Sequence, residues 1–466
     1  MDRLRGVGLG FRPALASDLL RQRGCVDFVE VVAEACLFNG AQRREVRALS
    51  ELWPVVPHGV KLSLGSANGI DVARVRALGQ LARELKSSVI TEHVAFVRTL
   101  SREIGHLTPL PRTATALGVL ERNLGVARAH LPDLPLLVEN VAWTVRYPER
   151  GEPHFPEPEF YSELVERTGV GMLLDLGNLY ANAINAGLEP ESELRRYPLH
   201  AVGMLHLAGG IFEDGFYFDD HAHAVPDQVL ALLETALAAV GDVPIVIERD
   251  ALFPPFAELS GEVSQVRAML RGRERLPVHS SLSARRPTHS ALQHPVLQPS
   301  ELQQFESQQA TLAELLTNLE FPNSSELAGF EAAELWRSRA ILQRKRLEEA
   351  LPLLARLGAY WRDLEPWAER VIAQCPRAPR LAAVTDALQI ASRAQREFDS
   401  PEIAFAARVD ALVLSARFIG EPGQALRPRH PPFVAHVRSP RGARLWVIKG
   451  FGSSAQTRIV ERNTAV

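Results

Sequence analysis

Short apolar runs alternate with helix-like stretches along the first 275 residues. Eight runs, most of them about 6 to 8 residues long and rich in Val, Leu and Ile, lie at 4–10, 26–32, 55–64, 88–94, 134–141, 170–177, 201–209 and 243–250. Such runs are typical of strands buried on both faces of a sheet. The intervening segments 69–86 and 226–240 have helical periodicity. Eight strand–helix units in about 270 residues predict a (β/α)8 TIM barrel.

A doubly wound open sheet is the alternative architecture for alternating strands and helices. That fold commonly carries a Gly-rich phosphate-binding loop after its first strand. The segment GVGLGF (6–11) lacks the GxGxxG pattern, and no helix start follows it. The barrel, of the xylose-isomerase-like kind, is therefore the favoured interpretation.

The pattern changes after the eighth apolar run. Residues 276–300 contain no Asp or Glu and are rich in Ser, Pro and His, a composition typical of a flexible linker. Over 329–375, apolar residues recur at three- and four-residue spacing, which predicts helices. Residues 443–459 predict two short strands around a Gly-Phe-Gly turn. We therefore expect a barrel at 1–275, a linker at 276–300, and a mainly helical domain with a short β hairpin at 301–466.

Composition and charge narrow the function classes. Hydrophobic residues make up 46% and charged residues 23% of the 466 positions, and no apolar run approaches the roughly 18 to 20 residues that cross a membrane. The three cysteines match no disulfide framework or zinc motif, and the N-terminus lacks a signal-peptide core, so we expect a cytoplasmic protein without a membrane partner.

The charges are unevenly distributed between the two parts of the chain. Of the 52 basic residues 24 follow residue 275, and of the 55 acidic residues 19 do, which leaves 28 basic and 36 acidic residues in the barrel. An acidic barrel argues against a nucleic-acid partner.

Charged and polar side chains interrupt or close six of the eight apolar runs. They are His58 in the third run, Glu92 and His93 in the fourth, Glu139 in the fifth, Asp175 and then Asn178 in the sixth, His206 in the seventh, and Glu248 and Asp250 in the eighth. The segment FDDHAHAVPD (218–227) follows the seventh run and adds Asp219, Asp220, His221 and His223. Because the ends of barrel strands converge on one mouth, we expect these side chains to lie close together.

Such a convergence favours a site for several metal ions. A single His in a strand is more often a core residue, but burying many carboxylates together is costly unless they are paired or bind metal. Uncompensated carboxylates repel one another, which raises their pKa values, and divalent cations relieve that repulsion. A mixture of imidazoles and carboxylates suits Fe, Mn or Zn better than Ca or Mg. The absence of a thiolate from these positions argues against a structural zinc site.

Eight segments in order carry a family resemblance: HGVKLSLG (58–65), TEHVAF (91–96), LTPLP (107–111), LLVEN (136–140), LLDLGN (173–178), HLAGG (206–210), FDDHAHAVPD (218–227) and IVIERD (245–250). Over roughly residues 5–255 the chain resembles the multinuclear non-haem iron-dependent oxidases, the family that includes the methanobactin biosynthetic oxidase. Members oxidise residues, often cysteine, in ribosomally made precursor peptides. The resemblance implies two or three iron ions, in mixed Fe(II)/Fe(III) states, with dioxygen as co-substrate and a precursor peptide as partner.

Carried over position by position, the resemblance implies nine metal ligands, which are His58, His93, Glu139, Asp175, Asn178, His206, Asp219, His221 and Glu248. It implies that Glu92 and Asp250 orient ligand imidazoles and that His223 serves the substrate or supports the ligands. The segment VVAEACLF (31–38) departs from the Glu-Asn pair of the family, because Ala35 follows Glu34. The resemblance therefore does not support a role for Glu34.

Other function classes compete with the oxidase. A xylose-isomerase-like hydrolase or isomerase, such as a trinuclear zinc endonuclease, would also place His, Asp and Glu at strand ends. The acidic barrel argues against a DNA substrate, because phosphate binding needs a basic groove. A non-catalytic peptide-binding barrel is the third class, although no expected ligand position is apolar. From Gly329 onward the helical segment resembles the small partner proteins of these oxidases, which implies a fused partner function that recruits the peptide.

Overall fold

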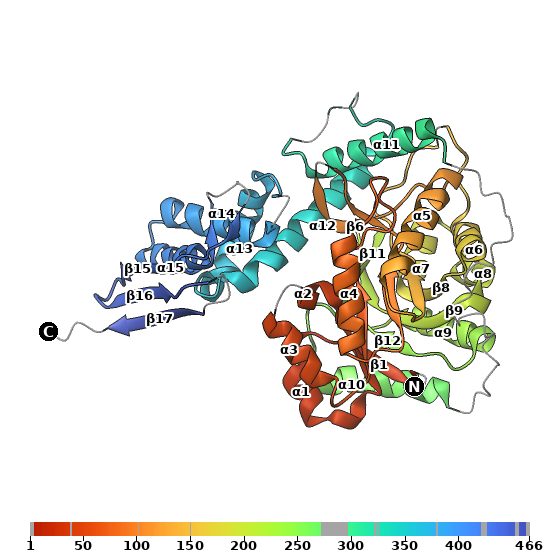
Figure 1. Cartoon of the computed structure of the whole chain (residues 1–466), viewed down its shortest axis with the longest axis horizontal. Coiled ribbons are helices and arrows are strands. Elements are labelled where there is room, and N and C mark those ends of the chain that lie inside the picture. Colours follow the sequence, from red (N-terminus) through yellow and green to blue (C-terminus); the bar gives the residue numbers. More distant parts are fainter. Residues whose placement is uncertain are drawn as a thin grey trace. The chain divides into compact units, whose positions relative to one another are not determined.

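The computed structural model describes residues 4–37, 40–100, 102–149, 151–271, 297–320, 323, 326–378, 381–420, 426–452 and 456–462. They divide into two compact units, of which the first comprises Met1–Val97 and Leu107–Gln309 and the second Arg98–His106 and Ala310–Val466 (Figure 1). Most of the expected linker at 276–300 lies outside the described residues, which resume at 297. Helix α11 (Pro299–Thr317) contributes residues to both units.

Eight parallel strands close into a barrel in the order β1-β12-β9-β8-β7-β4-β3-β2, which confirms the TIM-barrel prediction. Their bounds are β1 Val7–Gly10, β2 Phe28–Val32, β3 Val55–Gly59, β4 Ile90–His93, β7 Leu136–Glu139, β8 Gly171–Asp175, β9 Val202–Leu207 and β12 Ile245–Ile247. Each strand falls within one of the eight apolar runs. Nearly all strand residues are buried, because one face points into the barrel and the other packs against helices.

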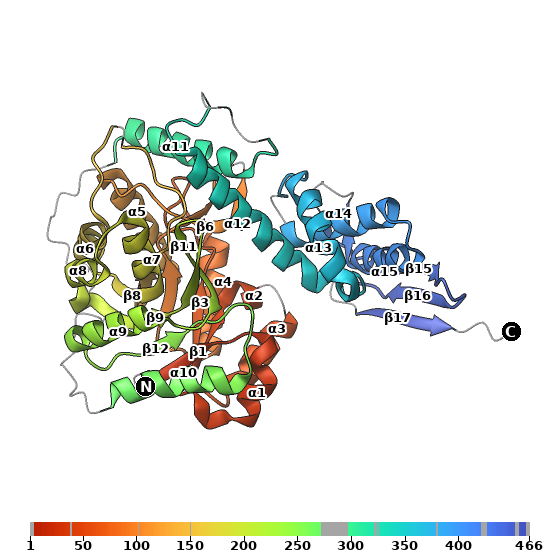
Figure 2. The same cartoon turned by 180° about the vertical axis from the view of Figure 1, so that it is seen from behind.

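Helices surround the barrel strands (Figures 1 and 2). They are α1 Ala16–Arg21, α2 Ala33–Leu37, α3 Gly40–Leu49, α4 Val72–Glu84, α5 Ala114–His130, α6 Glu157–Thr168, α7 Leu176–Ala186, α8 Pro190–Arg196, α9 Asp227–Val240 and α10 Phe256–Leu270. The predicted helical segments correspond to α4 and α9. Side chains of Asp71, Thr113 and Asp175 accept hydrogen bonds from the first turns of α4, α5 and α7 and so fix where these helices begin.

Two hairpins interrupt the alternation of strands and helices. One comprises β5 (Phe96–Arg98) and β6 (Glu103–Thr108) after β4, and the other comprises β10 (Gly209–Glu213) and β11 (Phe216–His223) after β9. Both follow strands that carry candidate metal ligands. Among the described residues, no helix is both long enough and apolar enough to cross a bilayer.

The second unit is mostly helical, as expected. Its helices are α12 Ala332–Ala350, α13 Trp361–Ala373, α14 Ala382–Glu397 and α15 Pro401–Arg417, and a core of Leu, Ile, Val and Ala joins them. The expected hairpin is formed by β16 (Arg444–Lys449) and β17 (Thr457–Arg462), and β15 (Phe433–Arg438) adds a third antiparallel strand. A further short pair, β13 (Phe418–Ile419) and β14 (Arg427–Pro428), follows α15.

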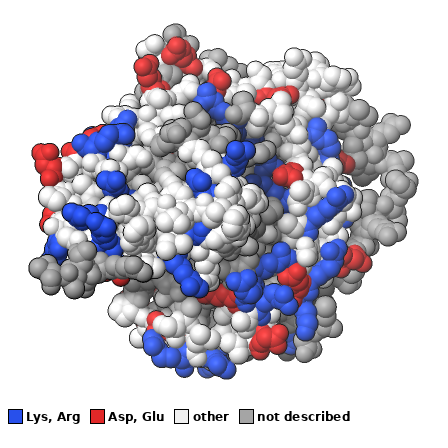
Figure 3. Space-filling model, turned by 60° about the vertical axis from the view of Figure 1, so that its left-hand side comes forward, with Lys and Arg blue, Asp and Glu red and all other residues white. Residues whose placement is uncertain are grey.

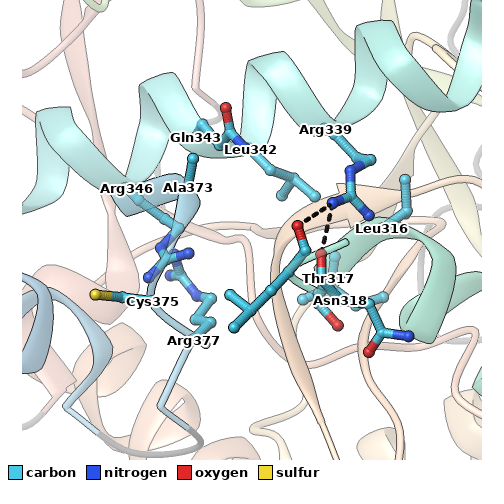
Figure 4. A pocket seen from close by; sticks show the side chains of 12 residues that line it. Leu316, Thr317, Asn318, Arg339, Leu342, Gln343, Arg346, Ala373, Cys375 and Arg377 are labelled. Atoms are coloured by element: carbon cyan, nitrogen blue, oxygen red, sulfur yellow. Dashed lines mark hydrogen bonds between the residues drawn. The ribbon is translucent and has the colours of Figure 1, made fainter. Parts of the chain in front are cut away.

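A pocket in the second unit is lined by three arginine side chains (Figure 4). Arg346 donates to both carboxylate oxygens of Asp386 at 2.9 and 2.7 Å, and Arg377 donates to Glu349 at 2.8 Å. Arg339 donates to backbone carbonyls at the C-terminal end of α11. The basic lining therefore holds helices of this unit together, and none of the expected metal ligands lines the pocket.

The Arg346–Asp386 pair predicts a large stability effect. Asp386 is fully buried, so the Asp386→Ala variant leaves the buried Arg346 charge without its partner. Such a change costs about 3–5 kcal/mol of unfolding free energy. Urea unfolding followed by fluorescence measures this, because four of the six tryptophans (Trp336, Trp361, Trp367 and Trp446) lie in the second unit. Replacement of the exposed Arg362 by Ala is the control, and a loss below about 1 kcal/mol for Asp386→Ala would contradict the prediction.

Candidate metal centre

The register of neighbouring strands brings the candidate ligands together. His93 of β4 lies beside Glu139 of β7, and Asp175 of β8 lies beside His206 of β9. Side chains at matching positions of parallel neighbours point to the same side of the sheet. All four side chains are buried. The barrel therefore gathers imidazoles and carboxylates from separate strands at its C-terminal mouth.

The Glu139 carboxylate lies between two groups of imidazoles. Its Oε2 is 3.5 Å from Nε2 of His58 and 3.2 Å from Nε2 of His93. Its Oε1 is 3.3 Å from Nδ1 of His206. Because each oxygen faces a different group, this carboxylate can bridge two metal ions.

Four overlapping groups of side chains have ligand atoms close enough to hold a metal ion. They are His58, His93 and Glu139; Glu139, Asp175, His206 and Glu248; Asp175, Asp219 and His221; and Glu30, His58 and Glu248. Within each group the ligand atoms lie within 4.8 Å of one another. Since the groups share members, the arrangement suits several neighbouring ions joined by bridging carboxylates.

Buried atoms without a hydrogen-bond partner provide a test of whether metal fits. Among the described residues, such atoms include Glu30 Oε1, Glu139 Oε2, Asp175 Oδ2, His206 Nδ1 and Asp219 Oδ1. Buried polar atoms are normally hydrogen-bonded, so a group of exceptions requires an explanation. All five are oxygen or imidazole-nitrogen donors, which Fe, Mn and Zn accept as ligands. The residues present therefore fit a cluster of such ions.

Burial and mutual repulsion disfavour the ionised carboxylates in the absence of metal. Burial, helped by the neighbouring carboxylates of Asp175 and Glu248, raises the pKa of Glu139 to about 8, although His206 opposes the shift. Burial and the Asp219 carboxylate raise the pKa of Asp175 to about 7. A bound cation would reverse both effects by favouring the ionised forms.

The imidazoles divide into two kinds. Burial lowers the pKa of His58 well below its usual value and that of His93 to about 4, so both rings are neutral and ready to ligate. Burial also disfavours charged His206 and His221, but carboxylates that include Glu248 outweigh it and raise both pKa values. These two imidazoles in turn lower the pKa of Glu248 despite its burial.

Hydrogen bonds fix which nitrogen of His58 and His93 faces the centre. Nδ1 of His58 lies 2.8 Å from Thr91 Oγ1, and Nδ1 of His93 lies 3.2 Å from the Gly59 carbonyl. The carbonyl can only accept, so His93 carries its proton on Nδ1. Both rings therefore present Nε2 to Glu139, as in protein sites where an outer hydrogen bond orients the ligand.

Asp175 is positioned by the ends of β7 and α7. The Asn140 side chain accepts from the Asp175 amide at 2.8 Å and donates to its carbonyl at 2.9 Å. Asp175 Oδ1 accepts from the Asn178 amide at 2.7 Å, which leaves Oδ2 for the centre. The Asn178 side chain accepts from Ala142 N and donates to the Asn140 carbonyl. These bonds hold Asn178 against the loop after β7, and its ligand role stays a prediction.

The loop after β9 differs from the simple extended strand that the sequence suggests. Nε2 of His221 lies 3.2 Å from Asp219 Oδ2, as the two-residue spacing predicts. The pairing of β10 with β11 is irregular between Phe218 and His223, however, and His221 has a left-handed φ of 55°. Such a bulge breaks the alternation of faces. His223 therefore does not continue the face of Asp219 and His221, as it would in a regular extended strand.

His223 instead pairs with a carboxylate outside the four groups. Its Nδ1 lies 3.0 Å from Asp220 Oδ1, and its side chain is 37% exposed. His221 is less exposed, at 20%, and its Nδ1 lies 3.1 Å from Glu248 Oε2. The solvent-facing edge of the centre is therefore formed by the loop that carries these two histidines.

The two carboxylates expected to orient imidazoles contact other groups. Glu92 accepts hydrogen bonds from the backbone amides of His93 and Leu62, so it holds backbone rather than a ring. Asp250 pairs with Arg12, and its amide donates to the His221 carbonyl at 2.7 Å. Among the described contacts, Glu92 therefore binds backbone and Asp250 binds Arg12, and the expectation that they orient ligand rings stays a prediction. Both still support segments that carry ligands.

Glu30 belongs to the centre although it was not among the residues predicted from the sequence, and Glu34 contacts the backbone after β3. Glu30 lies in β2, with Oε1 3.1 Å from Nε2 of His206. The sequence offered one signal for Glu30. It is a charged residue in the middle of the apolar run VDFVEVV (26–32), whose other charged residue, Asp27, lies near the start. Glu34 accepts from the amides of Val60 and Lys61 and so supports the loop after β3.

Comparisons with known proteins place the barrel in a family. The family described as "RiPP precursor modification enzyme MbnB/TglH/ChrH" matches residues 6–271. A UPF0276 protein of Streptomyces avermitilis is 41% identical over 282 residues, which cover 58% of this chain and 57% of that protein. A UPF0276 protein of Chromobacterium violaceum is 34% identical over 270 residues, which cover 58% of this chain and 96% of the relative. The match thus spans little more than half of the Streptomyces protein.

Solved structures with a similar barrel are more distant. Endonuclease IV from Thermus thermophilus is 20% identical with a TM-score of 0.38, covering 57% of this chain and 99% of its own. A xylose isomerase domain protein from Planctomyces limnophilus is 17% identical with a TM-score of 0.39, covering 57% and 95%. The family model, in contrast, matches more than half of the chain and includes every strand of the barrel. The chain belongs to the MbnB/TglH/ChrH family of enzymes that modify precursors of ribosomally synthesised peptides.

Proposed function

We propose that the barrel binds two or three iron ions at this centre and uses dioxygen to oxidise a residue, most often a cysteine in this family, of a precursor peptide. The observation that carries the proposal is the Glu139 carboxylate, which faces two imidazoles with one oxygen and a third imidazole with the other. A bridging carboxylate flanked by imidazoles is a donor set for adjacent redox-active ions. Bound iron would supply electron transfer to dioxygen and an open coordination position for the substrate.

The protein's own residues hold and shield the centre. Neutral His58 and His93 would hold one ion together with Glu139, and Glu139 would also serve the group containing His206 and Glu248. Nearly all of these side chains are inaccessible to water. A dry site strengthens electrostatic interactions between ligands and ions and limits side reactions.

The substrate approaches from the edge formed by the loop after β9. His221 and His223 are more exposed than the ligands of the strands, so peptide side chains reach the centre past them. The His223–Asp220 pair can take up or hold a proton at Nδ1 there. This assigns His223 to the substrate side and Asp219 and His221 to the metal side.

The second unit is proposed to serve the precursor peptide. The segment after Gly329 resembles the partner proteins of these oxidases, and the chain after residue 275 carries more basic than acidic residues, 24 against 19. Basic and acidic side chains are interspersed across the face drawn in Figure 3. A peptide would be recognised by side chains of the second unit, and salt would weaken the ionic part of that recognition.

Loss of the bridging carboxylate tests the proposed function. The chain reconstituted with Fe(II) without oxygen should carry two or three iron ions, and Glu139→Gln should lose most of them because it disrupts two ligand groups at once. Elemental analysis by mass spectrometry measures the content. The matched control is Glu157→Gln, whose carboxylate binds Asn182 and Tyr197 instead. Stoichiometric zinc that supports hydrolysis, with iron near zero, would favour the hydrolase or isomerase and contradict the oxidase.

The raised carboxylate pKa values predict proton release on metal binding. Metal-free Asp175 and Glu139 have pKa values of about 7 and about 8, so both hold protons at pH 6 that ligation must displace. Metal affinity should therefore rise with pH up to about 8. Calorimetry with Zn²⁺ in buffers of different ionisation enthalpy should show greater proton release at pH 6 than at pH 9. Equal release at the two pH values would contradict the assignment of these carboxylates as ligands.

Substitutions in the loop after β9 should separate metal binding from turnover. Asp219→Ala and His221→Ala remove members of a ligand group, so both should lose iron. His223→Ala should retain iron and lose about a hundredfold in turnover, the lower end of the usual range for a proton-transfer group. Iron content and peptide oxidation are measured on the same preparations. Equal iron loss in all three variants would show that His223 also binds metal.

A further inference from the structure

A buried loop runs from the metal-binding end of β3 to the start of α4. It leaves β3 immediately after His58 and Gly59, and residues 62–67 are all buried. Ser63 adopts a left-handed φ of 65°, which is unfavourable for a residue with a side chain. A buried segment of irregular structure must find partners for its backbone polar groups. The loop therefore depends on hydrogen bonds from outside itself.

Carboxylates hold the first part of this loop. Glu34 accepts from the amides of Val60 and Lys61 at 3.0 and 2.8 Å, and Glu92 accepts from the Leu62 amide at 3.2 Å. The same stretch contains the Gly59 carbonyl that orients the His93 ring. Movement of the loop would therefore shift the backbone beside two metal ligands.

Side chains hold the second part. Asn123 donates to the carbonyls of Leu64 and Ser66 at 2.8 and 2.9 Å. Gln309 donates to the Gly65 carbonyl at 2.7 Å and accepts from the Ala67 amide at 2.9 Å. The Gln309 side chain thus pairs with one backbone carbonyl and one backbone amide of the loop, as a neighbouring β-strand would.

Gln309 belongs to α11, beyond the last barrel helix. It is 1% exposed and lies 242 residues from Ala67 along the sequence. Asn68 and Glu306, one helical turn before Gln309, add a hydrogen bond of 2.5 Å between the same loop and helix. The first unit accordingly extends to Gln309 rather than ending with α10.

We propose that Gln309 is a positioning residue for the metal centre. Its amide clamps the loop after β3, and through the loop it fixes the geometry of His58 and His93. The inference rests on the proposed metal centre but not on the identity of the native metal. It assigns the helix after residue 297 a role in completing the barrel's active centre, which a barrel ending at residue 275 would lack.

The test compares variants of the full chain loaded with Co²⁺, whose visible absorption reports ligand geometry. Gln309→Met preserves side-chain length and removes both hydrogen bonds. It should shift the Co²⁺ spectrum and speed release of the ion to a chelator by about tenfold, the lower end of the range for residues that support ligands. The matched control is Gln303→Met at an exposed position of α11, which should match the parent chain. A Gln309→Met chain with the parent spectrum and release rate would overturn the proposal.

A measurement on the unaltered chain tests the proposal even if the Gln309→Met variant fails to fold. If loop order and metal binding are coupled, each must favour the other. Hydrogen exchange of the peptide spanning residues 60–68 should then slow when Co²⁺ binds, while a peptide from α9 should not change. Unchanged exchange in the loop would overturn the proposal. The iron content of the chain tests the proposed oxidase separately from this inference. A parent chain that binds no Co²⁺ would overturn both the proposed metal centre and the role of Gln309.

Discussion

Five carboxylates meet imidazoles in the mouth of a barrel where water is excluded. They are Glu30, Glu139 and Asp175 in barrel strands, Glu248 directly after β12, and Asp219 in β11, and their side chains are nearly inaccessible. Without compensation, their mutual repulsion would destabilise the fold, because each buried charge requires a partner. His206 and His221 supply part of the compensation, and the remaining unsatisfied oxygens mark where cations fit. Metal binding and stability of the mouth are therefore linked.

The supporting structure keeps these groups from rearranging. Thr91 and the Gly59 carbonyl fix the rings of His58 and His93, and Asn140 joins the ends of β7 and β8 around Asp175. Gly59 leaves room for the Glu92 carboxylate, since a Cβ at position 59 would lie 2.3 Å from Glu92 Oε2. A centre built this way presents fixed donor atoms, which is how a protein imposes geometry on an ion with few preferences of its own.

Local pattern was sufficient to predict the strands and most of the residues that meet at their ends. Apolar runs of strand length identify buried strands, and the barrel brings their ends together whatever the details of packing. Contacts between distant segments could not be predicted in this way. Glu30 and His206 are 176 residues apart, and Glu30 lies within a strand rather than at its end. The bulge that turns His223 toward Asp220, and the hydrogen bonds from Gln309, likewise depend on tertiary packing.

We propose above that Glu139 bridges adjacent iron ions. Anomalous diffraction at the iron absorption edge, on crystals of the full chain loaded with iron, tests it most directly. We expect two or three peaks in the barrel mouth, with Glu139 between two of them and His58 and His93 bound to one of that pair. A single peak, or iron peaks that make no contact with Glu139, would contradict it.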